Sequence, residues 1–362
     1  MAGTRSTGGL KALRAYGAPL AKTGLLRAGG YALLRRLAPS RRIAILRYHA
    51  VCDEAGYDYA SPGICVTPTA FDAQVRYLSG NYSVLPLPEI VARVRAGQPL
   101  PVNTVAITFD DGYADNLPAA RVLNRHGVSA TFYITAGCLH GDAPFWPSEV
   151  RYLVKAARGP ELRLRTPKET VVLPVGSDTD RERAIRAVNR LMKSNVIPVR
   201  EEIRQQLREA AGHPALPRHM LTWAELAEMR DLGMTIGAHT YSHANLPSAG
   251  LADATREITE SKARLERELS TPVTMFSYPN GGAERYYTPE LQRAVADAGF
   301  AAATSSHNAF AGRDSDLYAL ERIEVEERLE DLIFALEIER FAFRPVPTDN
   351  TPWTGGAQGR EH

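Results

Sequence analysis

Short apolar or β-branched segments alternate with helical patterns over most of this chain of 362 residues. Seven such segments are predicted to be strands: residues 43–48, 105–109, 130–135, 234–238, 273–278, 301–304 and 320–325. Five helical patterns lie between them, at residues 69–78, 117–126, 223–231, 252–269 and 289–298. Three of these are closely followed by glycine (Gly127, Gly233 and Gly299), as helix ends commonly are. The alternation predicts an α/β fold with parallel strands, and its regular rhythm favours one barrel over two unrelated domains.

One long segment interrupts this rhythm, because residues 139–221 separate the third predicted strand from the fourth. We expect helices at 148–157, 181–193 and 201–210, with a hairpin at 162–173 around Pro167. A structureless loop of that length is uncommon in a compact domain, so we interpret the segment as an insertion over one rim of the barrel. It either shapes the substrate cleft or only packs against the outside. The predicted organisation is a basic arm at 1–41, a barrel at 42–345 that includes this insertion, and a flexible tail at 346–362.

Composition excludes several classes of protein. Hydrophobic residues make up 44% of the chain and charged residues 23%, which is ordinary for a folded soluble protein. No apolar run approaches the roughly 20 residues that a transmembrane helix needs. The three cysteines, Cys52, Cys65 and Cys138, form no CxxC pair and predict neither a disulfide framework nor a thiolate metal site. Reduced thiols are consistent with a cytosolic protein.

Charge is distributed unevenly along the chain. Residues 1–42 contain nine Lys or Arg and no Asp or Glu, so the remainder carries a net charge of −7 within the overall +2. A mildly acidic body argues against nucleic-acid binding. In the arm, one helical stripe is formed by Leu26, Gly30, Leu33 and Leu37, while Arg27, Arg35 and Arg36 point elsewhere.

The arm has two interpretations. An amphipathic basic helix suits peripheral contact with anionic lipid through residues 1–38, at the inner face of a membrane. Alternatively the arm is a poorly ordered tail or a helix packed on the barrel. It does not resemble a signal peptide, because Lys22, Arg27, Gly29 and Gly30 interrupt its apolar stretches. We therefore expect a cytoplasmic protein.

The sequence Thr108-Phe109-Asp110-Asp111-Gly112-Tyr113 places two adjacent carboxylates at the end of a predicted buried strand. Such charges are costly to bury unless something compensates them. Because side chains alternate along a strand, one carboxylate can face a metal ion while its neighbour faces the attacking water. Gly112 allows a sharp turn directly after them.

Two further motifs follow later predicted strands. His239 and His243 are four residues apart, so a helical turn would let both imidazoles bind one ion. Two imidazoles and one carboxylate suit Zn²⁺ or a similar divalent metal and leave a coordination position open. Residues 276–282 (FSYPNGG) predict a rigid turn whose backbone N–H groups could point into the same site. Each fragment alone is commonly structural, but all three follow successive strands, and barrel active sites are built at the carboxyl ends of strands.

The set TFDDGY, HTYSH and SYPNG, in this order, resembles the polysaccharide deacetylases, the carbohydrate esterase family 4-like group with the NodB homology domain. The resemblance covers residues 42–325, with 139–221 as extra material. It implies a distorted (β/α)7 TIM-like barrel, here with an inserted helical segment and an N-terminal basic amphipathic arm. It also implies a hydrolase that removes N-acetyl groups from amino sugars with one divalent metal ion, for which we expect Zn²⁺.

The resemblance also implies roles for individual residues. Asp111, His239 and His243 would bind the metal, and Asp110 would be the general base that accepts a proton from the attacking water. The oxyanion would be bound by the metal and by the turn formed by Tyr278, Pro279 and Asn280, through the backbone N–H of Asn280.

Two positions depart from the family pattern. Ser277 stands where the family usually has an arginine that orients the catalytic aspartate, and Asn280 stands where it usually has an aromatic residue. In the late Leu-x-His motif, which supplies the general acid, Arg322 replaces the histidine. Arginine stays protonated and is a poor proton donor, so we hypothesise that Arg322 pairs with Asp110 in place of the missing arginine.

The general acid therefore remains open between His49, which ends the first predicted strand, and His307, which follows the sixth. His49 is predicted to be a site residue in either an orienting or an acid role. Either could instead be a histidine satisfied by local hydrogen bonds. Tyr113, Trp146 and Trp223 are candidates for stacking on a sugar ring, with core or rim packing as the alternative.

The predicted substrate is an N-acetylated amino sugar in a polysaccharide, an oligosaccharide or a lipid-linked glycan precursor. Two alternatives remain open. The same metal site could serve a deformylase, a cyclic ureide hydrolase or a sugar O-deacetylase, and the altered motifs are compatible with a catalytically impaired barrel that binds glycan.

Overall fold

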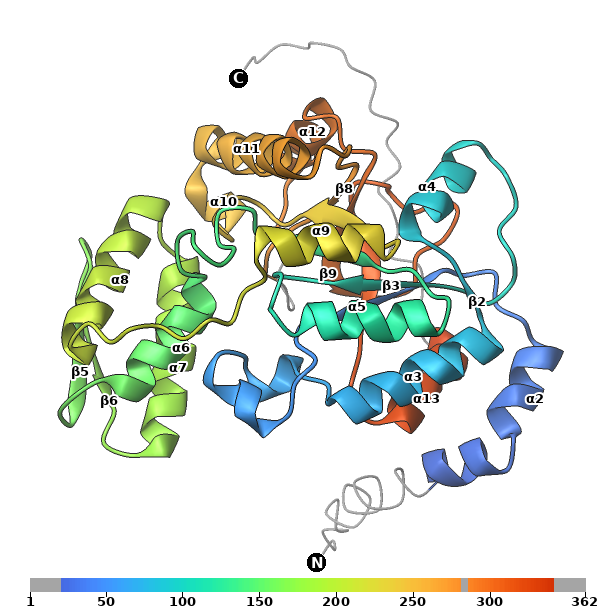
Figure 1. Ribbon diagram of the computed structural model, residues 1–362, viewed down its shortest axis with the longest axis horizontal. Coiled ribbons are helices and arrows are strands. Elements are labelled where there is room, and N and C mark those ends of the chain that lie inside the picture. Colours follow the sequence, from blue (N-terminus) through green and yellow to red (C-terminus); the bar gives the residue numbers. More distant parts are fainter. Residues whose placement is uncertain (1–20, 281–285, 342–362) are drawn as a thin grey trace, which may run out of the picture.

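The computed structural model describes residues 21–280 and 286–341. Within them, seven parallel strands close into a barrel surrounded by helices (Figure 1). In spatial order the strands are β1 (Ala44–Tyr48), β10 (Leu320–Glu324), β9 (Ala302–Asn308), β8 (Met275–Ser277), β7 (Thr235–Ala238), β4 (Thr131–Ile134) and β3 (Thr104–Phe109). Pairing of β3 with β1, from Ala44↔Val105 to Tyr48↔Phe109, closes the barrel. The predicted barrel is confirmed, and each strand coincides with a predicted segment.

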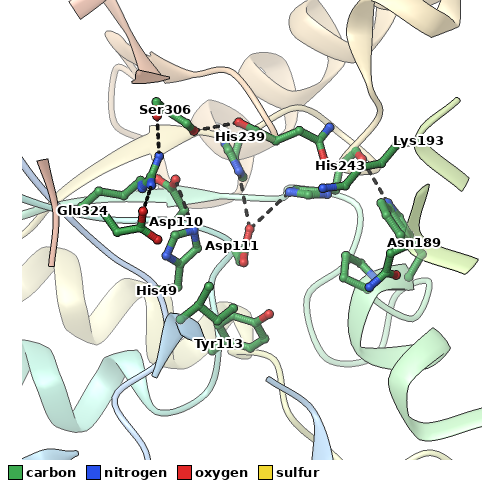
Figure 2. A pocket seen from close by; sticks show the side chains of 15 residues that line it. His49, Asp110, Asp111, Tyr113, Asn189, Lys193, His239, His243, Ser306 and Glu324 are labelled. Carbon is green, nitrogen blue, oxygen red and sulfur yellow. Dashed lines mark hydrogen bonds and ion pairs between the residues drawn. The ribbon is translucent and has the colours of Figure 1, made fainter. Parts of the chain in front are cut away.

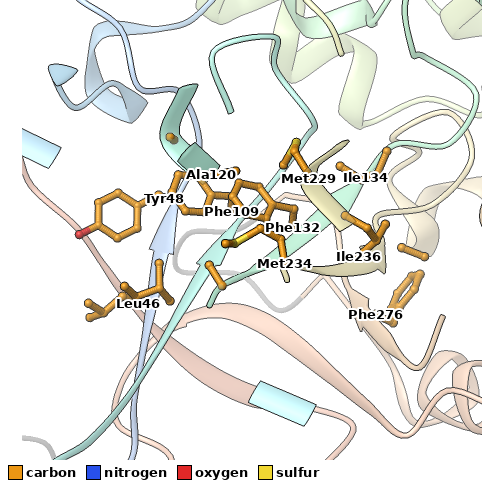
Figure 3. Packing of buried hydrophobic residues seen from close by; sticks show 14 of the residues in the cluster. Leu46, Tyr48, Phe109, Ala120, Phe132, Ile134, Met229, Met234, Ile236 and Phe276 are labelled. Atoms are coloured by element: carbon orange, nitrogen blue, oxygen red, sulfur yellow. The ribbon is translucent and has the colours of Figure 1, made fainter. Parts of the chain in front are cut away.

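Strands β1, β3 and β4 are largely apolar because both of their faces are covered. Every residue of β1, β3 and β4 is buried. Side chains on the outer face of the barrel pack against the helices, and Figure 3 shows Phe109 and Phe132 in this layer, stacked with centroids 4.5 Å apart. The inner face carries Ile45, Ala106 and Tyr133. Strand alternation then directs Asp110, the residue after Phe109, toward the barrel interior.

The five predicted helices are present as α3 (Pro68–Asn81), α5 (Asn116–Arg125), α9 (Trp223–Asp231), α11 (Leu251–Leu269) and α12 (Pro289–Asp297). The sequence analysis did not predict α4 (Leu87–Arg95) or α13 (Leu329–Glu337). Short elements complete the described chain: β2 (Ser83–Val84), which pairs with the start of β3, α10 (Leu246–Ala249), η1 (Glu54–Asp58), η2 (Pro62–Ile64) and η3 (Glu339–Phe341).

The segment between β4 and β7 folds over one side of the barrel with a hydrophobic cluster of its own (Figure 1). It contains α6 (Trp146–Ala156), the antiparallel pair β5 (Glu161–Arg165) and β6 (Thr170–Pro174), α7 (Asp178–Lys193) and α8 (Ile197–Ala211). Helix α6 contacts both α7 and α8. This arrangement leaves the first turn of α6 and the last turn of α7 beside the barrel rim.

The described part of the arm is helical at residues 21–27 and in α2 (Gly30–Leu37), which packs against α13. Its buried side chains are Tyr31 and Arg35, and Arg35 pairs with Glu337 at 3.0 Å. Arg35 points elsewhere than Leu33 and Leu37, as the sequence indicated, but it is buried, because a buried carboxylate on α13 compensates its charge. Leu33 and Leu37 are instead 59% and 75% exposed. Residues 1–20 and the predicted tail at 346–362 lie outside the described residues.

No helix in the described ranges combines the length and apolar character needed to cross a membrane. The three cysteines are free thiols. Two of them nevertheless lie side by side, with Cys52 Sγ 3.2 Å from Cys65 Sγ in the loop that follows β1. Thirteen positions separate this pair in the sequence, so spacing alone did not indicate the contact.

Candidate active site

A pocket of about 340 Å³ lies at the carboxyl ends of the barrel strands. Three of the predicted motifs reach it: Asp110 and Asp111 follow β3, His239 follows β7, and Asn280 comes shortly after β8. His243 and His49 line it too, and Figure 2 shows the carboxylates and the imidazoles facing one another across a small space. The strand register of the barrel brings these residues together from positions up to 231 apart in the chain.

Asp111, His239 and His243 form a compact set of buried ligand atoms. Asp111 Oδ1 lies 3.5 Å from His239 Nε2 and 3.3 Å from His243 Nε2, and the three ligand atoms are all within 4.8 Å of one another. His239 Nδ1 donates a hydrogen bond to the Ser277 carbonyl at 2.8 Å. That bond fixes the tautomer and leaves the Nε2 lone pair directed at Asp111. A carboxylate and two imidazoles in this geometry fit one divalent cation.

The backbone around the pocket is held in unfavourable conformations. Four of the seven non-glycine residues with positive φ in the described ranges lie here: Asp111 (81°), Thr240 (63°), His243 (54°) and Asn280 (70°). Left-handed backbone costs free energy for such residues and is concentrated at functional sites. At Asp111 it also breaks the strand alternation, and so both adjacent carboxylates face the pocket.

Asp110 is held by Arg322 of β10. The two guanidinium nitrogens Nη1 and Nη2 donate to Oδ1 and Oδ2 of Asp110, each at 2.7 Å. The remaining donors reach Thr108 Oγ1, the Ser305 carbonyl and Ser277 Oγ, so all five N–H groups of this fully buried side chain have acceptors. The predicted pairing of Arg322 with Asp110 is present.

Charge compensation keeps the Asp110 carboxyl ionised. Burial alone raises its pKa, but the adjacent Arg322 guanidinium, together with smaller contributions from His239 and His49, lowers it to about 2. Ser277 explains how an arginine from another strand fits here. Its small side chain leaves space where the family usually has the arginine itself, and its hydroxyl accepts a hydrogen bond from Arg322 Nη2 at 3.0 Å.

The two candidate proton donors lie in different environments. His49 lines the pocket, and its Nε2 is 3.8 Å from Asp110 Oδ2. Burial lowers the pKa of His49, although the negative charge of Asp110 opposes the shift. His307 is exposed near the end of β9 and does not line the pocket. The structure therefore places His49, and not His307, beside the predicted catalytic residues.

The prediction for the third motif is wrong for two of its three residues. Asn280 lines the pocket, but Tyr278 and Pro279 do not. Tyr278 follows the strand alternation of β8, so its ring points into the helix layer, where its hydroxyl donates to the Tyr318 carbonyl at 3.0 Å. Asn280 is suited to substrate contact, because its side-chain Oδ1 and Nδ2 are buried without partners among the described residues.

Of the three aromatic candidates for sugar stacking, two line the pocket and one does not. Tyr113 lines the pocket but is only 2% exposed and meets Phe145 edge-on, with ring centroids 5.7 Å apart. Trp146 contributes to the pocket wall and donates from Nε1 to the His243 carbonyl at 3.0 Å. Trp223 packs beside Arg264 and does not line the pocket. Tyr113 and Trp146 are each 2% exposed, so neither offers an open ring face to a sugar.

Several residues that line the pocket were not predicted: Arg47, Ile64, Pro147, Asn189, Lys193, Ser306 and Glu324. Arg47 had a signal, because an arginine within the otherwise buried strand β1 requires an acceptor, here the Ser306 carbonyl at 3.0 Å and Glu324. Asn189 and Lys193 had none, since they resemble the exposed side of any charged helix. Their position shows that the insertion shapes the cleft, which the sequence had left open.

The chain is similar to known proteins in sequence and in fold. YxkH of Bacillus subtilis, a protein named for the polysaccharide deacetylases, is 21% identical over 300 residues, which are 82% of this chain and 76% of that protein.

Two solved structures share the fold. The Streptococcus pyogenes deacetylase PplD in complex with acetate has a TM-score of 0.55 at 19% identity, over 83% of this chain and 100% of that chain. IcaB from Ammonifex degensii has a TM-score of 0.52 at 16% identity, over 83% and 98%. Residues 97–162 and 181–303, more than half of the chain, match the family described as polysaccharide deacetylase. The chain belongs to the polysaccharide deacetylase family.

Proposed function

We propose that this protein is a metal-dependent N-deacetylase of amino sugars in a polysaccharide, an oligosaccharide or a lipid-linked glycan precursor. One observation carries the proposal: in a single pocket, Asp111, His239 and His243 converge beside a second carboxylate, Asp110, whose orientation is fixed by Arg322. Members of this family hydrolyse N-acetyl amide bonds. The metal requirement and the amino-sugar substrate are what the proposal adds.

The pocket residues divide the reaction between them. A divalent cation held by Asp111, His239 and His243 would lower the pKa of water and polarise the acetyl carbonyl, and Zn²⁺ is the ion that suits these ligands best. Asp110 is ionised and oriented to accept a proton from the attacking water. The amide N–H of Asn280, which donates to no acceptor within the described part of the chain, supports the developing oxyanion.

The direct test is mass spectrometry of N-acetylated glycans after incubation with the protein, with the Asp110→Asn variant as control. Loss of one acetyl group, absent with Asp110→Asn and after removal of the metal by a chelator, is the expected result. Release of formate, opening of a cyclic ureide, or release of acetate only from O-acetyl esters would replace the proposal with another hydrolase on the same barrel. Binding of glycan without release of any acyl group would indicate a glycan-binding barrel.

His49 is proposed to protonate the leaving amine. The His49→Ala variant is expected to lose about 10²–10⁴-fold in kcat, the usual contribution of a general acid. A general acid must be protonated, so the wild-type rate should fall as pH rises through the His49 pKa. Because burial lowers that pKa below 6.5, this basic limb is expected on the acidic side of neutrality.

The profile of kcat/KM against pH checks this assignment, with His307→Ala as the matched histidine variant outside the pocket. The basic limb should disappear in His49→Ala and persist in His307→Ala. The opposite pattern would assign the proton to His307, and a limb retained in both variants would remove histidine from this role.

We also propose that the arm brings the protein to the inner face of a membrane, where a lipid-linked substrate would lie. Leu25, Leu33 and Leu37 are 45%, 59% and 75% exposed, while Arg27 and Arg36 beside them are exposed as well. Leucines next to exposed cations suit the interface of an anionic bilayer.

Cosedimentation with vesicles tests the membrane proposal. Wild-type protein is expected to bind vesicles that contain phosphatidylglycerol and to bind pure phosphatidylcholine weakly. A double variant, Leu33→Ser with Leu37→Ser, should lose most of this binding, whereas Leu251→Ser, which alters a leucine 55% exposed on α11, should retain it. Equal sedimentation of all three proteins would refute the contact.

A further inference from the structure

Helix α7 of the insertion contributes two polar side chains to the catalytic pocket. Asn189 and Lys193 are four residues apart on α7, which places them on the same face of the helix, and both line the pocket. Figure 2 shows them on the side of His243, across the pocket from Glu324. The end of α7 is also tied to the loop after His243, because Asn245 Nδ2 donates to the Lys193 carbonyl at 2.7 Å. This contact fixes the position of the two side chains relative to the metal-ligand set.

Among the described residues, the Lys193 ammonium forms no ion pair, and Asp111 is the carboxylate whose charge acts on it from a distance. Within residues 21–280 and 286–341, no acceptor lies within hydrogen-bonding distance of Nζ and no carboxylate lies within ion-pair distance. The arginines of the site differ in this respect: Arg47 pairs with Glu324 at 3.2 Å and Arg322 pairs with Asp110. Lys193 is partly buried, and a partly buried cation without a partner is unfavourable until an anion meets it.

The charges of the pocket also favour an anionic ligand. The charges of Arg322 and Asp110 cancel each other, and so do those of Arg47 and Glu324. Asp111 is the one remaining carboxylate among the residues that line the pocket, and a divalent cation held by it would more than neutralise its charge. Lys193 then gives the loaded pocket a net positive charge, which raises the local concentration of anions.

Asn189 adds a hydrogen-bond acceptor to this face. Its side-chain Oδ1 is buried and has no partner among the described residues. A buried acceptor left without a donor costs free energy, and a sugar hydroxyl is a donor of suitable size. Together the two side chains present an acceptor and a cation, one helical turn apart, to a ligand in the cleft.

We propose that Asn189 and Lys193 form a subsite for an acidic glycan, in which Lys193 binds a carboxylate or a phosphate group carried next to the acetylated amino sugar and Asn189 accepts from a hydroxyl of the same unit. The inference rests on the proposed deacetylase function and names its substrate class. A uronic acid would supply the carboxylate, and a phosphodiester or a lipid-linked phosphate would supply the phosphate.

The test compares three oligosaccharides of equal length that contain one N-acetylglucosamine beside a neutral sugar, a uronic acid or a phosphorylated sugar. Wild-type protein is expected to prefer an acidic substrate by about 10-fold or more in kcat/KM, the range expected for a hydrogen bond to a charged group. In Lys193→Gln this preference should fall to near unity through a rise in KM, and Lys193→Arg should restore part of it. Lys168→Gln, which alters an exposed lysine of the same insertion, should leave the preference unchanged.

A binding measurement separates this inference from the proposed function. Calorimetry of metal-loaded protein with the deacetylated uronic-acid and phosphorylated oligosaccharides, which offer no acetyl group to hydrolyse, should show binding by wild type that Lys193→Gln weakens to the level of the neutral analogue. If no substrate is hydrolysed while this difference in binding persists, the subsite is supported and the deacetylase function is refuted. The subsite is overturned if wild type does not discriminate among the three glycans, or if Lys193→Gln lowers kcat equally for all of them.

Discussion

Replacing Arg322 with alanine is expected to abolish most of the deacetylase activity and to destabilise the fold. The substitution leaves the buried Asp110 carboxylate without its two charge-assisted hydrogen bonds. Breaking a buried ion pair by removing one partner costs about 3–5 kcal/mol of folding stability. Only the smaller contributions of His239 and His49 then oppose the effect of burial, so the pKa of the Asp110 carboxyl rises and the general base is protonated over more of the working pH range.

A second buried arginine allows the two effects to be distinguished. Arg35 pairs with Glu337 at a position outside the catalytic pocket, and Arg35→Ala should destabilise the protein to a similar degree while kcat stays close to wild type. In Arg322→Ala, kcat should fall by about 10²-fold or more, and the acidic limb of its pH profile should move to higher pH. Arg322→Lys keeps the charge but not the forked geometry, so its kcat should lie between that of wild type and that of Arg322→Ala. An Arg322→Ala protein with unimpaired kcat would discard the orienting role of Arg322.

The adjacent aspartates are expected to fail in different ways. Asp111→Asn removes the charged member of the Asp111, His239 and His243 set, so bound metal should be lost and activity with it. Asp110→Asn leaves that set intact, so bound metal should be retained while kcat falls by about 10²–10⁴-fold, the usual contribution of a general base.

The metal content of each variant after dialysis, measured by inductively coupled plasma mass spectrometry, tests these separate roles of Asp110 and Asp111 alongside the rate. Thermal unfolding provides a readout independent of activity, because a ligand that binds the native state raises its stability. Added Zn²⁺ should raise the melting temperature of wild type and Asp110→Asn, but not of Asp111→Asn. Full metal content in both variants would show that Asp111 is not a metal ligand. Loss of metal from Asp110→Asn alone would assign the metal to Asp110 instead.

The strands and the chemistry of the pocket could be read from local sequence. Runs such as residues 105–109 are apolar on both faces because a parallel barrel buries both, and this signal is independent of distant contacts. The motif residues Asp110, Asp111, His239 and His243 are polar groups at the ends of such runs, where burial requires a partner or a ligand. Domain limits at 41 and 345 remain predictions.

Orientation within the motifs was harder to predict. Alternation along β8 sends Ser277 inward and Tyr278 outward, so the tyrosine predicted for the substrate site lies in the helix layer. Asp111 does not follow the alternation of β3, because its backbone φ of 81° directs the side chain into the pocket. Whether a residue follows its strand or departs from it depends on how the following turn is held, and that is decided by neighbouring strands.

By itself, the sequence determined the barrel strands, the polar motifs that follow them and the absence at Ser277 of the arginine usual in the family, which predicted a substitute. Only the tertiary structure decided that Arg322 meets Asp110 with both nitrogens, that His49 and not His307 reaches the pocket, and that Lys193 of the insertion faces the metal-ligand set. The physical reason is the separation in sequence over which each interaction acts. Burial and strand periodicity act between close neighbours in the chain, whereas these contacts join strands and helices that closure of the barrel and packing of the insertion bring together.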